Sequence, residues 1–325
     1  MGDVEKGRQR RSRRFVVLTY YEYAPRAKGP AALLDGLFEH PALPVVGDIT
    51  IPSQHSLPLV ILGAGYTGTF LYHQAVKQGW KAFATSRFPG THLSYVEPPS
   101  RILFDLEQPD TWGNIPTPAH IIWCFPAIPE NLASTFAKDI ANKESRILLL
   151  GSTSAFPANP DELTDERAKL NMALPRVQSE EHLRKTYGVI ILRLAGLYGP
   201  GRHVLNWIRR GKIKNTGRYV NLIHVEDAAA LCLAALDQAE SGSSYIVADG
   251  TPRLWADICQ FAATQWNIPI PEPTIPKDLG KRLSSQKVLK ELNYELKHPN
   301  LFEELNKIEA NGEGTMNTES VIRET

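Results

Sequence analysis

Cysteine, net charge and long apolar runs are all scarce in this sequence. The three cysteines, Cys124, Cys232 and Cys259, are an odd number, lie far apart and show no Cys-x-x-Cys spacing, which argues against a disulfide framework and a zinc site. The 36 Lys and Arg residues nearly balance the 35 Asp and Glu residues, so no overall field favours nucleic acid or an anionic membrane surface. No run of about 18 apolar residues is present to span a bilayer. We therefore expect a cytoplasmic protein that binds neither nucleic acid nor membrane.

The two ends of the chain differ in composition from the middle. Residues 1–57 hold the basic run RQRRSRR ahead of a short apolar stretch, which superficially resembles a targeting peptide, but the stretch is too short and too polar. The Pro and Gly content up to residue 57 predicts a poorly ordered extension, with a targeting or partner-binding role as the alternative. Residues 306–325 are predicted to be a disordered tail because their last part has almost no apolar periodicity.

Between these ends, short apolar runs alternate with stretches long enough for helices. Runs that are apolar at every position suit strands buried on both faces, and parallel neighbours need crossover connections. We therefore predict an α/β fold, a Rossmann-type doubly wound parallel sheet with a small C-terminal substrate lobe. The expected strands are 59–63, 81–86, 101–105, 120–125, 146–152 and 189–195.

Three glycines follow the first of these runs. Gly63, Gly65 and Gly68 form G-x-G-x-x-G directly after a predicted strand and before a predicted helix over 69–78 that stops at Gly79. This context indicates a dinucleotide site: the first glycine permits a tight turn, the second lets the backbone approach a pyrophosphate, and the third allows close packing of helix on strand. We assign to the cofactor Gly63, Gly65, Tyr66, Thr67 and Gly68.

The end of the second strand indicates which dinucleotide is bound. Sites for NAD place an Asp or Glu about 20 residues further on, to bind the ribose hydroxyls. Here Thr85, Ser86 and Arg87 stand instead. A guanidinium and hydroxyls suit the 2′-phosphate of NADP. We predict NADP as the cofactor, with Ser86 and Arg87 on its 2′-phosphate; NAD is the less favoured cofactor, and an ordinary surface arginine is the alternative for Arg87.

From residue 57 to residue 305 the sequence resembles the extended and atypical short-chain dehydrogenase/reductases, also called the NAD-dependent epimerase/dehydratase group. The resembling stretches are LFDLEQPDTW, WCFPA, LLLGSTSAFP, ILRLAGLYGPGR and NLIHVEDAAALCLAAL. The resemblance implies that Asp105 faces the adenine, that Phe125 lies beside the cofactor, and that Ala195 and Leu197 border the nicotinamide. It also puts Ser152 at the catalytic Ser/Thr position.

The same resemblance implies the domain organisation. A dinucleotide-binding Rossmann core takes residues 58–198, and residues 219–247 return to it. Residues 199–218 and 248–305 then form the substrate lobe. Substrate selectivity is expected around Asn206 to Arg218, where RRGKIKNTGR can meet a phosphate or carboxylate of a small-molecule substrate. A solvated basic loop is the alternative. A monomer or homodimer is expected.

One element of the family pattern is missing. Active members carry Tyr-x-x-x-Lys after the fifth strand, where tyrosine transfers a proton and lysine lowers its pKa. Residues 155–180 contain no tyrosine, and Arg176 or Val177 falls at the lysine position. Arg176 can hold the cofactor by charge or be an exposed helix residue. Two hypotheses remain: an NADP-dependent oxidoreductase or epimerase acting on a small polar or nucleotide-linked substrate, and a non-catalytic NADP-binding sensor or regulatory protein.

Overall fold

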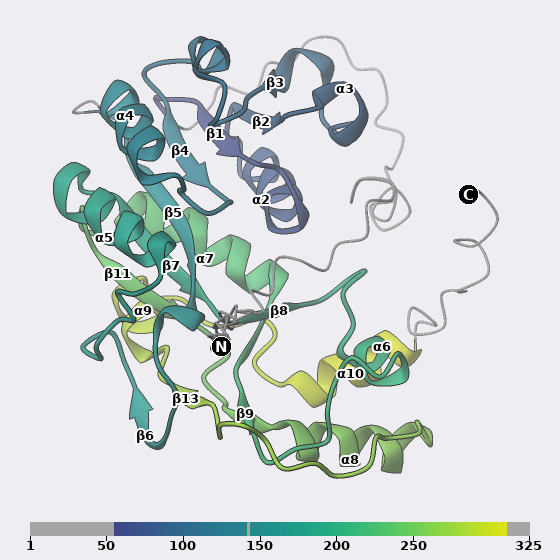
Figure 1. Cartoon of the computed structure of the whole chain (residues 1–325). Helices are drawn as coiled ribbons and strands as arrows, with labels where there is room; N and C mark the ends of the chain where they lie inside the picture. Colours follow the sequence, from purple (N-terminus) through teal and green to yellow (C-terminus); the bar gives the residue numbers. More distant parts are fainter. Residues whose placement is uncertain (1–54, 142–143, 311–325) are drawn as a thin grey trace, which may run out of the picture.

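A parallel sheet of seven strands forms the centre of the computed structural model, which describes residues 55–141 and 144–310 (Figure 1). The strands lie in the order β11-β7-β5-β4-β1-β2-β3, so the winding reverses between β1 and β4. The carboxyl ends of strands at such a reversal are where open α/β sheets bind ligands. The predicted fold class is confirmed. The strands are β1 (Leu59–Leu62), β2 (Ala82–Ser86), β3 (Arg101–Leu103), β4 (His120–Trp123), β5 (Ile147–Ser152), β7 (Ile190–Leu194) and β11 (Ser244–Val247).

Helices cover both faces of this sheet. α2 (Tyr66–Lys77) and α7 (Val225–Gln238) pack on one face, and α4 (Glu130–Ile140) and α5 (Pro175–Tyr187) pack on the other. In β1, Leu59 and Ile61 join the core beneath the first pair of helices, whereas Val60 and Leu62 join the core beneath the second. A strand between two helical layers must be apolar on both faces, which explains the uninterrupted run LVIL.

A smaller lobe lies below the sheet in Figure 1. Its helices α6 (Val204–Arg209), α8 (Trp255–Trp266) and α10 (Leu301–Ala310) share a separate apolar core. The division of the chain at residues 198, 219 and 248 stays a prediction. Short pairs of strands connect the two parts: β10 (Leu222–His224) with β8 (Gly196–Tyr198), β12 (Arg253–Leu254) with β9 (Tyr219–Val220), and β13 (Lys281–Leu283) with β6 (Asn159–Thr164).

The remaining elements are short. They are α3 (Pro89–His92), α9 (Gln286–Glu291) and three 3₁₀ turns, η1 (Pro98–Ser100), η2 (Pro109–Asn114) and η3 (Thr153–Ala155). The turn η3 follows β5 directly: Ser152 of the predicted catalytic segment is the last residue of β5, and Ser154 lies in η3. Within the described residues, no helix is both long and apolar enough to cross a membrane.

Two expectations about the ends of elements are wrong. The first helix begins at Tyr66, three residues before the expected start, because Gly65 already has the extended conformation of an N-cap residue. Residues 306–310 belong to α10 rather than to a tail, since Ile308 packs in the core of the lobe. Of the predicted N-terminal extension, His55 stacks on Trp80 with ring centroids 3.4 Å apart. The predictions for residues 1–54 and 311–325 lie outside the described residues.

Candidate functional site

The three motif glycines play different parts in the loop between β1 and α2. A Cβ on Gly63, whose φ is +78°, would lie 2.6 Å from Cδ1 of Phe125, and a Cβ on Gly68 would lie 2.9 Å from the carbonyl oxygen of Gly63. These two glycines therefore allow close internal packing. A Cβ on Gly65 would meet no atom within 4 Å. Gly65 leaves open space at the amino end of α2, where backbone N–H groups and the helix dipole favour a phosphate.

The end of β2 is tied to this loop. The backbone N–H of Gly63 donates to Thr85 Oγ1 at 2.9 Å, and Thr85 is fully buried. The expectation that two hydroxyls serve a 2′-phosphate is therefore wrong for Thr85, because its oxygen supports the glycine loop. Ser86 Oγ accepts from the N–H of Phe88 at 3.0 Å and lies 3.1 Å from Nδ1 of His92. Arg87 is exposed beside them, at the carboxyl end of the strand.

Arg202, a residue that the sequence did not indicate, lies over the start of α2. Tyr66 is the first residue of that helix, and its hydroxyl donates to the carbonyl of Pro200 at 3.0 Å. The Arg202 guanidinium lies 5.4 Å from the centre of the Tyr66 ring, a cation–π distance. Burial raises the pKa of Tyr66. Residues 199–202 therefore lie against the amino end of α2, so Arg202 is placed near the open space at Gly65.

The other predicted cofactor residues lie along the same edge of the sheet. Phe125 follows β4 and faces Gly63, as the Cβ distance shows. Asp105 follows β3, and its Oδ1 accepts from the N–H of Glu107 at 3.0 Å. Ala195 follows β7, and Leu197 lies within β8. The doubly wound topology thus brings these residues to one edge, while their contacts with a cofactor stay a prediction.

Ser152 belongs to a chain of hydrogen bonds at the end of β5. Its Oγ lies 3.0 Å from Oγ of Ser154, which in turn accepts from Nη2 of Arg176 at 2.7 Å. Nη1 of Arg176 donates to Oε1 of Glu180, also at 2.7 Å. The side chain of Arg176 is only 12% exposed. Arg176 is therefore not an exposed helix residue, and its direct partner is Ser154 rather than Ser152.

A buried network of ion pairs continues from Glu180, the last residue of this series of hydrogen bonds. Arg193 on β7 is 2% exposed, and its Nη2 lies 2.8 Å from Oε1 of Glu181 and 3.4 Å from Oε2 of Glu180. Arg193 also donates to Oγ of Ser244. Burial raises the pKa of Glu180, and the neighbouring guanidiniums oppose that rise. Buried charges are tolerated when they are paired in this way.

Lys281 is a second residue at the site that the sequence did not single out. It lies on β13, and its Nζ donates to the carbonyl of Thr153 at 2.9 Å and to that of Phe156. Burial lowers the pKa of Lys281 to about 8, and the nearby guanidiniums of Arg218 and Arg176 lower it too. An ammonium group from the C-terminal part of the chain therefore holds the turn that carries Ser154.

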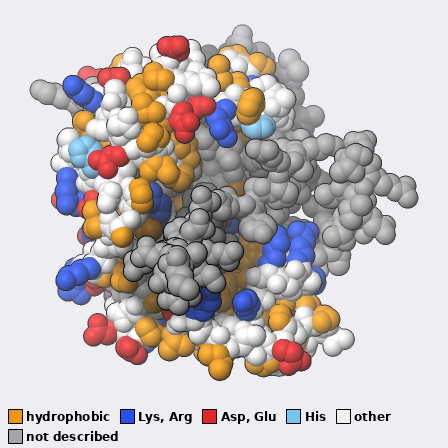
Figure 2. All heavy atoms as spheres, viewed as in Figure 1, with side chains coloured by type: hydrophobic (Ala, Val, Ile, Leu, Met, Phe, Trp, Pro, Cys, Tyr) orange, Lys and Arg blue, Asp and Glu red, His pale blue; other side chains and the backbone are white. Residues whose placement is uncertain are grey.

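The basic segment after α6 is partly neutralised within the lobe. Arg209 forms an ion pair with Glu309 at 2.8 Å, and Arg218 forms one with Asp278 at 3.1 Å. Figure 2 shows Lys and Arg side chains gathered on this face of the lobe near α6. Because ion-paired arginines are less available for a ligand, the geometry gives this segment less support as an anion site than its charge suggests.

One cluster of the described residues, His224, Glu226 and His298, has a composition that can bind a metal ion. Oε2 of Glu226 and Oε2 of Glu304 lie 3.3 Å and 3.1 Å from the ring nitrogens of His298. Burial lowers the pKa of His298, but these two carboxylates outweigh burial and raise it overall. Nδ1 of His224 accepts from the N–H of Glu226 as the N-cap of α7. We interpret the cluster as an ion pair and a helix cap, since Nδ1 of His224 and both ring nitrogens of His298 already have partners.

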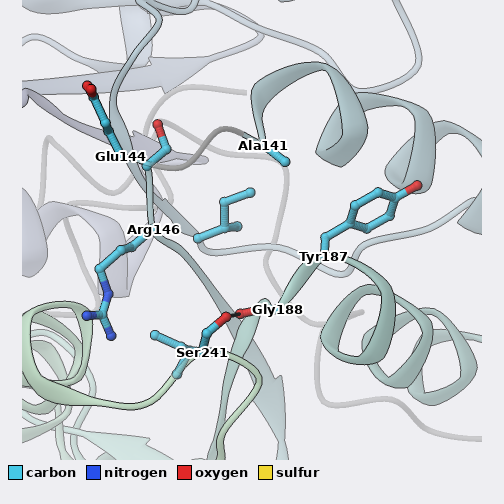
Figure 3. Close-up of a pocket in the computed structure, with 9 residues that line it drawn as sticks. Ala141, Glu144, Arg146, Tyr187, Gly188 and Ser241 are labelled. Carbon is cyan, nitrogen blue, oxygen red and sulfur yellow. Dashed lines mark hydrogen bonds between the residues drawn. The ribbon is translucent and has the colours of Figure 1, made fainter.

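A cavity of about 460 Å³ lies at the opposite edge of the sheet, where β5 and β7 begin (Figure 3). Arg146 on its wall donates to the carbonyls of Asp237 and Ala239 at the end of α7. The hydroxyl of Tyr187 points away from the other labelled residues in Figure 3 and lies 3.0 Å from Oγ of Ser134. These polar groups are therefore engaged elsewhere, and the cavity is remote from the glycine loop.

The sequence and structure of the chain were compared with those of known proteins. No protein-family model matches the chain. Over 179 residues it is 29% identical to protein YeeZ of Escherichia coli K12, a match that covers 49% of this chain and 61% of that protein. The solved structure of a nucleoside-diphosphate-sugar epimerase from Pseudomonas aeruginosa is 19% identical, with a TM-score of 0.65 over 80% of this chain and 99% of the other. The chain shares the doubly wound α/β fold of that protein.

A further structure supports this assignment of the fold. A short-chain dehydrogenase/reductase superfamily protein from Agrobacterium tumefaciens, solved with bound NAD, has a TM-score of 0.65 at 12% identity, covering 81% of this chain and 99% of the other. The match to the curated relative spans less than two thirds of that protein. The predicted resemblance to the short-chain dehydrogenase/reductase fold is confirmed, and activity and substrate are matters of proposal.

Proposed function

We propose that this chain is an NADP-binding, atypical short-chain dehydrogenase/reductase, acting in the cytoplasm as an oxidoreductase or epimerase. Its substrate is a small polar or nucleotide-linked molecule that bears a phosphate or carboxylate. The observation that carries the proposal is the open space at Gly65, because a Cβ would fill the point where the first turn of α2 can receive a pyrophosphate. Arg87, and no carboxylate, follows β2, which supports NADP over NAD.

The first test concerns the 2′-phosphate. Arg87→Ala is expected to weaken NADPH binding by about 1.5–3 kcal/mol, roughly tenfold to a hundredfold, because one charge-assisted hydrogen bond is lost. The affinity for NADH should stay the same, since NADH lacks this phosphate. The fluorescence of bound NADPH, and competition by NADH, measure both constants. An unchanged preference in the variant would contradict the role of Arg87.

The residues at the end of β5 determine what chemistry is available. A bound nicotinamide supplies or accepts a hydride. Ser152 can orient a carbonyl or hydroxyl, directly or through a water molecule, while the guanidinium of Arg176 only donates hydrogen bonds and can bind a ligand. Residues 155–180 hold no tyrosine that could replace the usual acid. The remaining proton donors are Ser152 with water, or the substrate itself.

The second test concerns turnover. General acid catalysis contributes roughly 10²–10⁴-fold, so panels of sugars, steroids and aldehydes should be oxidised or reduced slowly or not at all, although NADP(H) binds. The absorbance of NADPH measures the rates of the wild-type protein and of Ser152→Ala. Rapid turnover that survives Ser152→Ala would contradict this account, because it would need catalytic groups other than those described here.

A non-catalytic NADP-binding sensor or regulatory protein is the second candidate function. The contact between Arg176 and Ser154 favours it, because a permanently charged group occupies the region of the usual acid–base pair. The two functions differ in what happens to bound NADPH. A sensor binds NADPH and does not oxidise it, whatever substrate is added, whereas an enzyme oxidises NADPH when its substrate is present.

A further inference from the structure

The turn η3 after β5 receives a cation from each of two distant parts of the chain. Arg176, in the first turn of α5, donates Nη2 to Oγ of Ser154 at 2.7 Å. Lys281, on β13, donates Nζ to the carbonyl of Thr153 at 2.9 Å. The pairing of β13 with β6 and the packing of α5 on the sheet thus bring two positive charges to the segment that contains Ser152.

The neighbourhood of Arg176 carries an excess of positive charge. Arg176 and Arg193 share the carboxylate of Glu180, and Arg193 and Arg184 share that of Glu181. In this network of described residues, three guanidiniums therefore face two carboxylates, which leaves one net positive charge.

Lys281 adds a second positive charge. The partners of its Nζ are the carbonyl oxygens of Thr153 and Phe156, which carry no formal charge. The nearby carboxylate of Asp278 lies 3.1 Å from Nε of Arg218 and forms an ion pair with it. The lowered pKa of Lys281 reflects its half-buried position beside other cations. A half-buried ammonium interacts strongly with an anion because little water screens it.

We propose that Arg176 and Lys281 bind an anionic group of the substrate, a phosphate or a carboxylate, beside Ser152 and Ser154. This inference rests on the proposed function, because it places the substrate at the same end of β5. The two serine hydroxyls add hydrogen-bond donors, and the guanidinium offers a planar fork that matches both kinds of anion. The proposal therefore places the anion site at the turn after β5, and not at the basic segment around Arg209 and Arg218, whose charges are paired.

The experiment measures anion binding to the full chain saturated with NADPH. Inorganic phosphate and malonate are titrated separately, by calorimetry and by the rise in unfolding temperature that a bound ligand causes. Lys281→Met is expected to weaken binding of the preferred anion at least tenfold, while the affinity for NADPH changes less than twofold. Lys281→Arg keeps the charge and should stay within about threefold of the wild type. Lys185→Met, an exposed lysine at the other end of α5, is the matched control.

Several results would overturn the proposal. Equal anion affinity in Lys281→Met and the wild type would remove Lys281 from the site, as would failure of both anions to bind. A loss in Lys212→Met with Lys214→Met, and not in Lys281→Met, would place the anion at the basic segment. If Lys281→Met fails to fold, Lys281→Gln takes its place with the same expected loss. Before the anions are added, NADPH is titrated into the chain, and this step tests the proposed function separately. Absence of NADPH binding would contradict the proposed function, and anion binding would then be measured on the chain without cofactor.

Discussion

Gly65→Asp is expected to weaken binding of NADP(H) more than a hundredfold, without lowering the unfolding temperature. The added side chain enters open space, and Gly65 has a negative φ of −76°, so the left-handed conformation that disfavours L-residues does not arise. Asp is a favoured N-cap, and α2 has no side-chain cap at this position, so the fold should gain stability. The carboxylate would, however, occupy the space of the pyrophosphate and repel it, at a cost of several kcal/mol.

Calorimetric titration and thermal unfolding together test this prediction. Gly113→Asp is the matched control, because Gly113 is exposed in η2 and its Cβ would also meet no atom within 4 Å. The control should bind NADP(H) as the wild type does. Undiminished binding by Gly65→Asp would show that the cofactor does not approach the amino end of α2.

Arg193→Met is expected to lower the free energy of unfolding by about 3–5 kcal/mol, because Glu180 and Glu181, both buried, lose the guanidinium that they share. Glu180 and Glu181 would keep Arg176 and Arg184 as partners, so we expect the lower end of this range. Methionine fills much of the same volume, which limits any effect of a cavity. Equilibrium unfolding in urea measures the change.

The control for this prediction is the exposed ion pair of Arg167 with Asp165. The side chain of Arg167 is 91% exposed, so Arg167→Ala should leave the urea midpoint unchanged. If Arg193→Met were as stable as the wild type, the buried network would contribute nothing to the fold. Its role in holding Arg176 against Ser154 would then need another explanation.

The parts of the site that the sequence predicted are formed by residues near one another in the chain. The run LVIL, the glycine motif and the helix after it are local, so apolar continuity and glycine spacing were enough to predict the cofactor loop. The predicted start of the helix was three residues late because residues 66–68 were assigned to the loop, whereas Gly65 is already the N-cap of α2. Local patterns thus give the existence of elements better than their ends.

The missed residues depend on long-range contacts. Lys281 reaches Thr153 through the pairing of β13 with β6, two short strands without a clear apolar pattern. Arg202 lies over Tyr66 only because residues 199–202 fold back on α2. Thr85 carries a hydroxyl like Ser86, and only the tertiary structure shows that it is bound to Gly63. None of these contacts leaves a periodicity or spacing in the sequence.

Calorimetric titration of the wild-type chain with NADPH and, separately, with NADH tests the central claim most directly. The account predicts that NADPH binds with one site per chain and more tightly than NADH, since Arg87 and not a carboxylate follows β2. Equal affinities, or tighter binding of NADH, would contradict the assignment of the cofactor. Absence of binding by either dinucleotide would contradict the dinucleotide site itself.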